Sequence, residues 1–245
     1  MVNFKKIFQL IVHPMVITKK YNKIILLSHM RSRSSVLSHV LGSHSDISGY
    51  YEQHQRHADP LFEIKVKANL LLDNNLSSKH RYLYDKVLHE RFDPKSLQGY
   101  KVIVLIRKPS SALKSIMSMG DITKSLWGKD PYRAFAYYCQ RLQSIIDIVE
   151  KNNIDVCFVE ADELVEKTDD ILGEISNFLE LSSPLSSHYR SFDKTGEAIY
   201  GDPSDNIKSG SIVKTKNNTT VVVPDGLLDI AQCYYERCKS LCLKS

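Results

Sequence analysis

The stretch Ile24–Ser35, IILLSHMRSRSS, joins an apolar run to a loop of hydroxyl and arginine side chains. Its first four residues, Ile24–Leu27, are typical of a strand that is buried on both faces of a parallel sheet. Beyond the loop, apolar residues recur at helical spacing from Val36 to Leu41, and Gly42 marks the expected end of that helix. The stretch therefore predicts a strand, a short polar loop and a helix.

The loop has the chemistry of an anion-binding site. The first N–H groups of a helix have no partner within the helix, and the helix dipole favours negative charge beside them. Three hydroxyl donors and two fixed positive charges accompany these groups, from Ser32, Ser34, Ser35, Arg31 and Arg33. We expect this loop to hold a phosphate or a similar anion.

A second unit of the same kind follows later in the chain. Lys101–Ile106, KVIVLI, is a β-branched run typical of a buried strand, and Arg107-Lys108-Pro109 comes directly after it. Proline is tolerated at the first position of a helix, so Pro109 favours a helix there.

The rest of the pattern alternates strands with helices. Further strands are expected at Asp46–Tyr51, Tyr82–Tyr84 and Asp155–Val159, and helices at Pro60–Leu72, Pro131–Val149, Ile171–Leu181 and Pro224–Leu243. This order predicts an α/β fold, a single domain over residues 1–245 with a central, mostly parallel sheet flanked by helices. We expect its core at about 22–182, an irregular region at 183–223 that covers the binding site, and a C-terminal helix at 224–243.

Composition and charge narrow the function classes. The chain of 245 residues is 42% hydrophobic and 25% charged, as in an ordinary globular protein. Its net charge of +5 suits an anionic ligand, but its 33 basic residues are scattered among 28 acidic ones, which argues against a nucleic-acid partner.

Five cysteines without metal-ligand spacing predict reduced thiols in a cytoplasmic protein and no metal site. The apolar run at 4–12 is too short to span a membrane. None of these features predicts an oligomeric state.

Together, the two strand-loop units resemble the sulfotransferases that use 3′-phosphoadenosine 5′-phosphosulfate (PAPS) and release 3′,5′-adenosine diphosphate. In that family the first loop wraps the 5′-phosphosulfate, while an arginine that ends a later strand, with a serine eight residues on, holds the 3′-phosphate. The resemblance places four residues on the phosphosulfate: Arg31, Ser32, Ser34 and Ser35. Arg107 and Ser115 match the second pair.

Other segments extend the resemblance. Residues 158–165 and 175–179 are similar to the family's strand-to-acidic-loop segment and the helix that follows it. The resemblance implies a three-layer sandwich like that of P-loop NTPases, and no metal. Gly201–Gly210 is similar to a late loop that closes over the nucleotide, which makes Lys208 a candidate phosphate contact.

Two positions depart from the family pattern. Arg33 stands where the family usually has glycine, so it either changes the backbone path of the loop or supplies a further phosphate contact. Ala161 replaces an aromatic residue that packs near the adenine in some members, which leaves Tyr189 or Tyr200 as candidates for that contact.

The chemistry implied by the resemblance is in-line sulfuryl transfer, in which charge builds on the bridging oxygen of the leaving nucleotide. Positive charge and positioning therefore supply much of the catalysis. Arg31 is expected to stabilise the bridging oxygen, with Lys86 as a second cation on the sulfuryl oxygens. For the general base we rank Glu52 first, Asp85 second and His89 third.

The expected acceptor is a hydroxyl, or an amine, of a carbohydrate or a small metabolite. Two other functions remain open at this point. One is a P-loop phosphotransferase that uses ATP, although the chain lacks G-x-x-x-x-G-K-[ST]. The other is a module that binds a nucleotide or a polyanion without catalysis.

Overall fold

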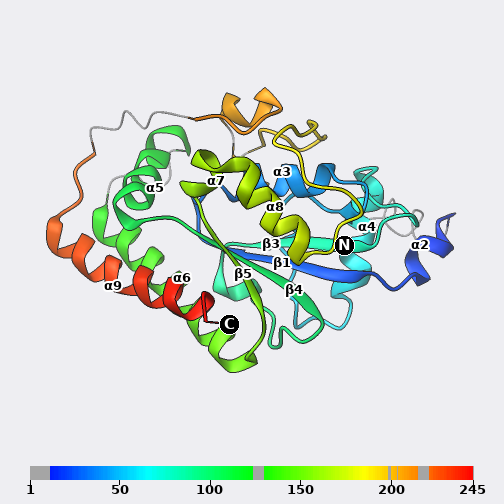
Figure 1. Cartoon of the computed structure of the whole chain (residues 1–245), viewed down its shortest axis with the longest axis horizontal. Coiled ribbons are helices and arrows are strands. Elements are labelled where there is room, and N and C mark those ends of the chain that lie inside the picture. Colours follow the sequence, from blue (N-terminus) through cyan, green and yellow to red (C-terminus); the bar gives the residue numbers. More distant parts are fainter. Residues whose placement is uncertain (1–11, 124–129, 198–199, 203, 215–220, 245) are drawn as a thin grey trace.

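The computed structural model describes residues 12–123, 130–197, 200–202, 204–214 and 221–244. Its centre is a parallel sheet of five strands in the order β2-β3-β1-β4-β5 (Figure 1). The strands are β1 (Asn22–Ser28), β2 (Ile47–Ser48), β3 (Tyr82–Val87), β4 (Tyr100–Ile106) and β5 (Val156–Glu160). The predicted α/β fold with a parallel sheet is confirmed.

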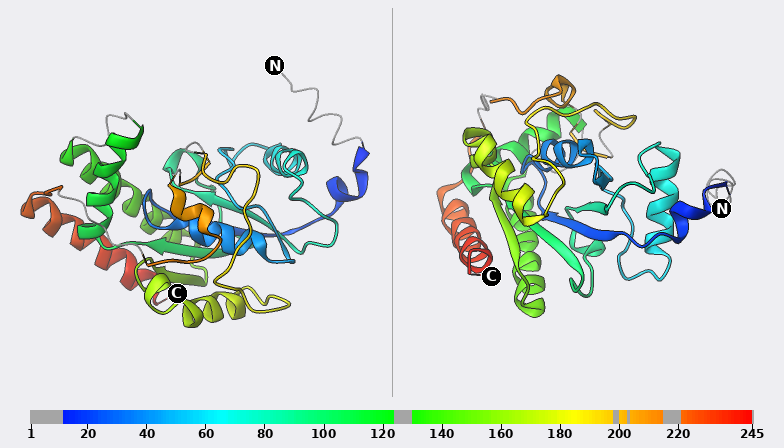
Figure 2. Two further views of the ribbon diagram at one scale, coloured as in Figure 1. Left: turned by 90° about the horizontal axis from the view of Figure 1, so that it is seen from above. Right: turned by 45° about the vertical axis from the view of Figure 1, so that its right-hand side comes forward.

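Helices connect the strands and cover the sheet. They are α2 (Pro14–Thr18), α3 (Ser34–Ser43), α4 (Phe62–Leu72), α5 (Pro109–Thr123), α6 (Pro131–Asn152), α7 (Glu163–Glu166), α8 (Thr168–Phe178) and α9 (Asp225–Cys242). Two 3-10 helices are named η1 (Glu90–Phe92) and η3 (Asp205–Ser209). In both views of Figure 2, α2 and α4 lie at the opposite end of the molecule from α9.

The sheet is the middle of three layers. Neighbouring side chains of a strand point to opposite faces of the sheet. In β1, Ile25 and Leu27 pack with apolar residues of α5, α6 and α9, whereas Ile24 and Leu26 pack with those of α3 and α8. Both faces of the strand are thus buried, which is why its sequence is apolar at every one of these positions.

One predicted boundary is wrong. Gly42 lies inside α3, which continues to Ser43. A Cβ atom at Gly42 would lie 2.5 Å from the Cβ of Tyr50 and 2.7 Å from the carbonyl oxygen of Gly49. The glycine therefore allows the chain after β2 to pass close to the helix, and it does not end the helix.

The strands on one side of β1 also differ from expectation. β2 is shorter than predicted, because only Ile47 and Ser48 pair with β3. β3 is longer and runs to Val87, because its residues pair with β1 as far as Leu27. As a result, Asp85 and Lys86 lie within a strand and not in the loop after it.

No helix among the described residues is both long enough and apolar enough to cross a membrane. Most of the apolar run at 4–12 lies outside the described residues. So do residues 198–199, 203 and 215–220 of the irregular region that we predicted at 183–223.

Candidate active site

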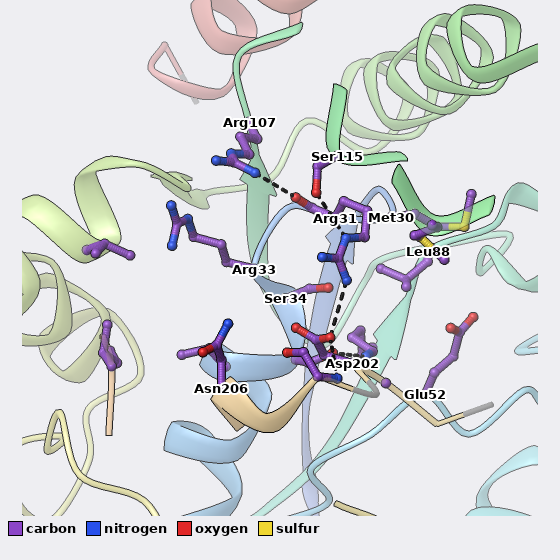
Figure 3. Close-up of a pocket in the computed structure, with 18 of the residues that line it drawn as sticks. Met30, Arg31, Arg33, Ser34, Glu52, Leu88, Arg107, Ser115, Asp202 and Asn206 are labelled. Atoms are coloured by element: carbon purple, nitrogen blue, oxygen red, sulfur yellow. Dashed lines mark hydrogen bonds and ion pairs between the residues drawn. The ribbon is translucent and has the colours of Figure 1, made fainter. Parts of the chain in front are cut away.

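The candidate site lies at the carboxyl ends of the strands, where the strand order reverses around β1. From β1 the chain passes to β2 and β3 on one side, and then to β4 and β5 on the other. Such a switch point leaves a crevice outside the strand ends, where ligands bind. A cavity of about 320 Å³ lies here, lined by the loops after β1, β2, β3 and β4 and by residues within 201–213 (Figure 3).

The backbone of the first loop takes two left-handed steps. Arg31 has a φ of 64° and Arg33 a φ of 67°, and α3 begins directly afterwards at Ser34. The Ser32 hydroxyl donates to the His29 carbonyl over 2.8 Å. Ser32 is buried, and its hydrogen bond stabilises the turn on the side away from the cavity. Ser34 and Ser35 line the cavity.

His29 connects the loop after β1 to the loop after β4 by hydrogen bonds. Its Nδ1 lies 2.8 Å from the Met30 carbonyl oxygen, and its Nε2 accepts a hydrogen bond of 3.0 Å from the Arg107 N–H. Burial lowers the pKa of His29 to about 4, so the imidazole is neutral and Nδ1 carries the proton. The loops after β1 and β4 therefore keep a fixed distance from each other.

Three arginines converge on the cavity. Arg31 Nε donates to the Ser115 hydroxyl over 3.0 Å, and its Nη1 lies 3.3 Å from Asp202 Oδ1. Arg107 Nε lies 3.1 Å from Asp162 Oδ1, and Arg33 Nη2 lies 3.4 Å from the same oxygen. The cations thus form two groups, Arg31 in one and Arg33 with Arg107 in the other, and each group is paired with one aspartate.

Glu52 lies across Arg31 from Arg33 and Arg107 (Figure 3), and Lys86 lines the same cavity. Burial raises the pKa of the Glu52 carboxyl, against the lowering effect of Lys86 and His54. Glu52 Oε1 makes no hydrogen bond to the described residues, and His54 Nδ1 lies 3.6 Å from it. Lys86 is 1% exposed, and its Nζ lies 3.4 Å from the Ser35 hydroxyl.

The other predicted bases lie in different surroundings. Asp85 stands outside the cavity lining because it neighbours Lys86 within β3, and alternate residues face opposite sides. Its Oδ1 accepts from the Gln53 N–H over 3.0 Å, and its Oδ2 lies 2.9 Å from His57 Nε2. His89 does line the cavity, and burial lowers its pKa to about 4.

Three residues proposed for the nucleotide are not part of the cavity lining. Lys208 is 56% exposed at its side chain and pairs with Asp205 over 3.0 Å. Tyr189 packs edge-on against His39, and Tyr200 packs edge-on against Tyr51.

Sequence reasoning missed several residues of the lining. Asp202 belongs to the polar stretch that we expected to cover the site, but its pairing with Arg31 joins residues 171 positions apart. An apolar part of the lining comes from Val36, Val165 and Ile212. No cluster of three or more histidine, cysteine or acidic side chains suited to a metal occurs in the described part of the chain.

Solved structures share this architecture. A sulfotransferase domain from the olefin synthase of Synechococcus PCC 7002 superimposes with a TM-score of 0.56 and 18% identity, over 89% of this chain and 96% of that one. A sulfotransferase domain from the curacin biosynthetic pathway gives a TM-score of 0.59 and 19% identity, over 89% and 99%. The chain has the sulfotransferase fold. A sulfotransferase from Alicyclobacillus acidocaldarius also matches, with a TM-score of 0.52 and 12% identity over 92% of this chain and 96% of that one. No protein-family model and no curated protein sequence matches the chain.

Proposed function

We propose that the protein transfers a sulfuryl group from PAPS to a hydroxyl, or an amine, of a carbohydrate or a small metabolite. One observation carries the proposal. A single cavity holds two arginine sites and, beside them, a buried carboxylate with an oxygen that makes no hydrogen bond to the described residues. A nucleotide with anionic groups at both ends fits the two arginine sites, and the sulfotransferase fold supports this assignment.

The donor would bind across the two sites. The N–H groups that open α3, the hydroxyls of Ser34 and Ser35, and Arg31 would hold the 5′-phosphosulfate. Ser32 would contribute its backbone N–H, because its hydroxyl donates to the His29 carbonyl. Arg107 and Arg33, which share Asp162, would hold the 3′-phosphate. The Ser115 hydroxyl accepts from Arg31 Nε and would donate its own proton to the same phosphate.

The nucleoside would lie between these two anion sites. The apolar residues Val36, Val165 and Ile212 offer a surface for the adenine. A phosphate contact from Lys208 would require η3 to move, since the ammonium group is paired with Asp205 outside the cavity.

Glu52 would act as the general base. Its carboxylate would take the proton of the acceptor hydroxyl while the acceptor oxygen forms a bond to sulfur and the bond from sulfur to the bridging oxygen breaks. Arg31 and Lys86 would stabilise the negative charge on the bridging and sulfuryl oxygens. Because burial raises the Glu52 pKa above 4.5, activity should rise with pH through a value above that of an ordinary glutamate.

Nucleotide binding tests the proposal first. At about a hundred times its dissociation constant, 3′,5′-adenosine diphosphate should stabilise the protein by about 2.7 kcal/mol in a thermal-shift assay. Arg107→Ala should weaken this binding by about tenfold or more while the affinity for 5′-adenosine monophosphate changes little, because a charge-assisted contact to the 3′-phosphate is lost. Arg237→Ala, at an exposed site, is the control. Stabilisation by ATP with Mg²⁺ but not by 3′,5′-adenosine diphosphate would contradict the proposal and support the phosphotransferase.

Turnover tests the base. Radiolabelled PAPS is supplied with N-acetylglucosamine, glucosamine and 4-nitrophenol as probe acceptors. Glu52→Gln should lower kcat by about 10²-fold or more and leave the affinity for 3′,5′-adenosine diphosphate unchanged. A fully active Glu52→Gln variant would assign the base to His89 or Asp85. Nucleotide binding without transfer to any probe would favour the non-catalytic module.

A further inference from the structure

The Tyr137 hydroxyl of helix α6 contacts the backbone of two residues that line the cavity. This hydroxyl accepts a hydrogen bond of 2.8 Å from the Met30 N–H and donates one of 2.9 Å to the Leu88 carbonyl. Met30 and Leu88 both line the cavity, while Tyr137 stands outside the lining. One phenol group therefore joins the loop after β1 to the loop after β3.

The loop after β1 carries Arg31, one of the two groups that must be aligned for transfer. The loop after β3 contacts the other, Glu52, which follows β2. Met30 immediately precedes Arg31, which the proposed function places on the bridging oxygen. Leu88 lies beside Glu52, and its N–H group lowers the pKa of the Glu52 carboxyl. Lys86 of β3 and His54 of the Glu52 loop also lower the pKa of this carboxyl, and the charge of Asp85 in β3 raises it. Leu88 thus supplies a backbone contact within a group of charged side chains.

We propose that Tyr137 is a positioning residue that fixes the Arg31 loop relative to Glu52. The inference rests on the proposed function, because it assigns Tyr137 a part in sulfuryl transfer. In-line displacement requires the cation at the leaving oxygen and the base at the acceptor oxygen to be in place together. A displacement of about 1 Å in such an arrangement can lower the rate by about 10²-fold.

The neighbouring residues of α6 make different contacts. The Tyr138 hydroxyl donates to the Arg107 carbonyl over 2.8 Å, on the nucleotide side of the site. Arg141 donates to the carbonyls of Ser28 and Val87, which are the last residues of β1 and β3. These contacts hold the strand ends, whereas the Tyr137 hydroxyl holds the cavity-lining residues beyond them.

Tyr137→Phe tests the role, because it removes the hydroxyl and keeps the ring. The affinity for 3′,5′-adenosine diphosphate should stay unchanged, while kcat with the best probe acceptor should fall by about tenfold or more. The acidic limb of the pH profile of kcat should move to higher pH, since Glu52 loses the fixed Leu88 N–H that lowers its pKa. A purely structural role for Tyr137 would not move this limb.

The matched control is Tyr235→Phe in α9. The Tyr235 hydroxyl is buried as well, but it makes no hydrogen bond to the residues that the structure describes, so kcat, affinity and pH profile should all be retained. Tyr137→4-aminophenylalanine keeps a donor toward the Leu88 carbonyl but is a poor acceptor for the Met30 N–H, so it should restore the acidic limb and recover only part of the lost kcat. Melting temperatures show whether each variant is folded at the assay temperature.

Two results would overturn the inference. One is a folded Tyr137→Phe variant that keeps its kcat and the acidic limb of the wild type. The other is a folded 4-aminophenylalanine variant whose acidic limb is shifted as far as that of Tyr137→Phe. A wild-type protein that binds no 3′,5′-adenosine diphosphate and transfers no sulfuryl group would instead overturn the proposed function, and this role with it.

Discussion

Arg33 shows how a residue can occupy a position that favours glycine. Its φ of 67° lies in the left-handed region, which costs an ordinary L-residue about 1 to 2 kcal/mol. Its guanidinium lies 3.4 Å from Asp162, a contact that glycine could not make. The loop therefore follows a path open to glycine, and the arginine side chain adds positive charge to the cavity.

The strain at Arg33 can be measured by comparing two variants that both lose the guanidinium. Arg33→Gly should have a free energy of unfolding about 1 kcal/mol higher than Arg33→Ala, because only alanine keeps a Cβ at a positive φ. Urea denaturation measures the difference.

The control for this comparison is Gln232, an exposed position inside α9. There the order should reverse, with alanine more stable than glycine by about 1 kcal/mol. Equal stability of the two variants at position 33 would show that the backbone relaxes without cost.

At the scale of elements, α6 is held to the sheet by a buried arginine. Arg141 is 1% exposed and donates to the Ser28 carbonyl over 2.8 Å and to the Val87 carbonyl over 3.0 Å. Its Nη1 also lies 2.7 Å from Asp93 Oδ2. One planar guanidinium thus binds a carboxylate and the last carbonyls of two adjacent strands. The loops that follow these strands line the candidate site.

Arg141→Lys should lower the free energy of unfolding by about 2 to 4 kcal/mol. A lysine keeps the charge but cannot reach all three partners at once, so at least one buried carbonyl loses its donor. Urea denaturation measures the loss. Arg237→Lys, at an exposed ion pair with Glu150, should change stability by less than about 0.5 kcal/mol. An equally small change at Arg141 would mean that the strand ends need no such donor.

The elements differ in how far the sequence could predict them. The strands β1 and β4 are continuous apolar runs, because helices cover both of their faces. Their short length and the polar loops that follow them are typical of buried strands. The end of β3 was harder to predict, since Asp85 and Lys86 are charged and only their pairing with β1 keeps them in the sheet. The position of that end decides which of the two side chains faces the cavity.

Long-range contacts in the candidate site were beyond prediction for a related reason. Helical periodicity places Tyr137 on a buried face, but nothing local indicates that its hydroxyl lies between Met30 and Leu88. Asp162 and Asp202 likewise meet their arginines only once the chain is folded.

At the scale of the whole molecule, the chain after α8 returns to the cavity and contributes Gly201, Asp202, Ser204 and Asn206 to its lining. The Tyr189 N–H donates to the Gly210 carbonyl over 2.8 Å, which holds the two arms of this segment together. Gly201 lies against α3, where a Cβ atom would be 3.0 Å from the Ser35 hydroxyl. Asp202 is brought to Arg31 in this way, so a carboxylate of the protein occupies the place beside the arginine that the proposed function gives to the phosphosulfate.

Asp202→Asn should therefore tighten the binding of 3′,5′-adenosine diphosphate. The amide oxygen can still accept from the Ser204 N–H, which Asp202 Oδ1 does over 3.0 Å, so the variant removes the charge and keeps this turn. The pair with Arg31 is about one-quarter exposed on both sides, which limits the effect to about 0.5 to 1 kcal/mol, or about two- to fivefold in Kd.

Calorimetry at two salt concentrations measures the effect, and the gain should shrink at about 1 M salt because charges are screened there. The control is Asp229→Asn at an exposed position of α9, whose Kd should match that of the wild type. Weaker binding by Asp202→Asn would mean that this carboxylate holds the segment closed over the nucleotide. In that case Asp202 would belong to the binding site itself, and it would not compete with the ligand for Arg31.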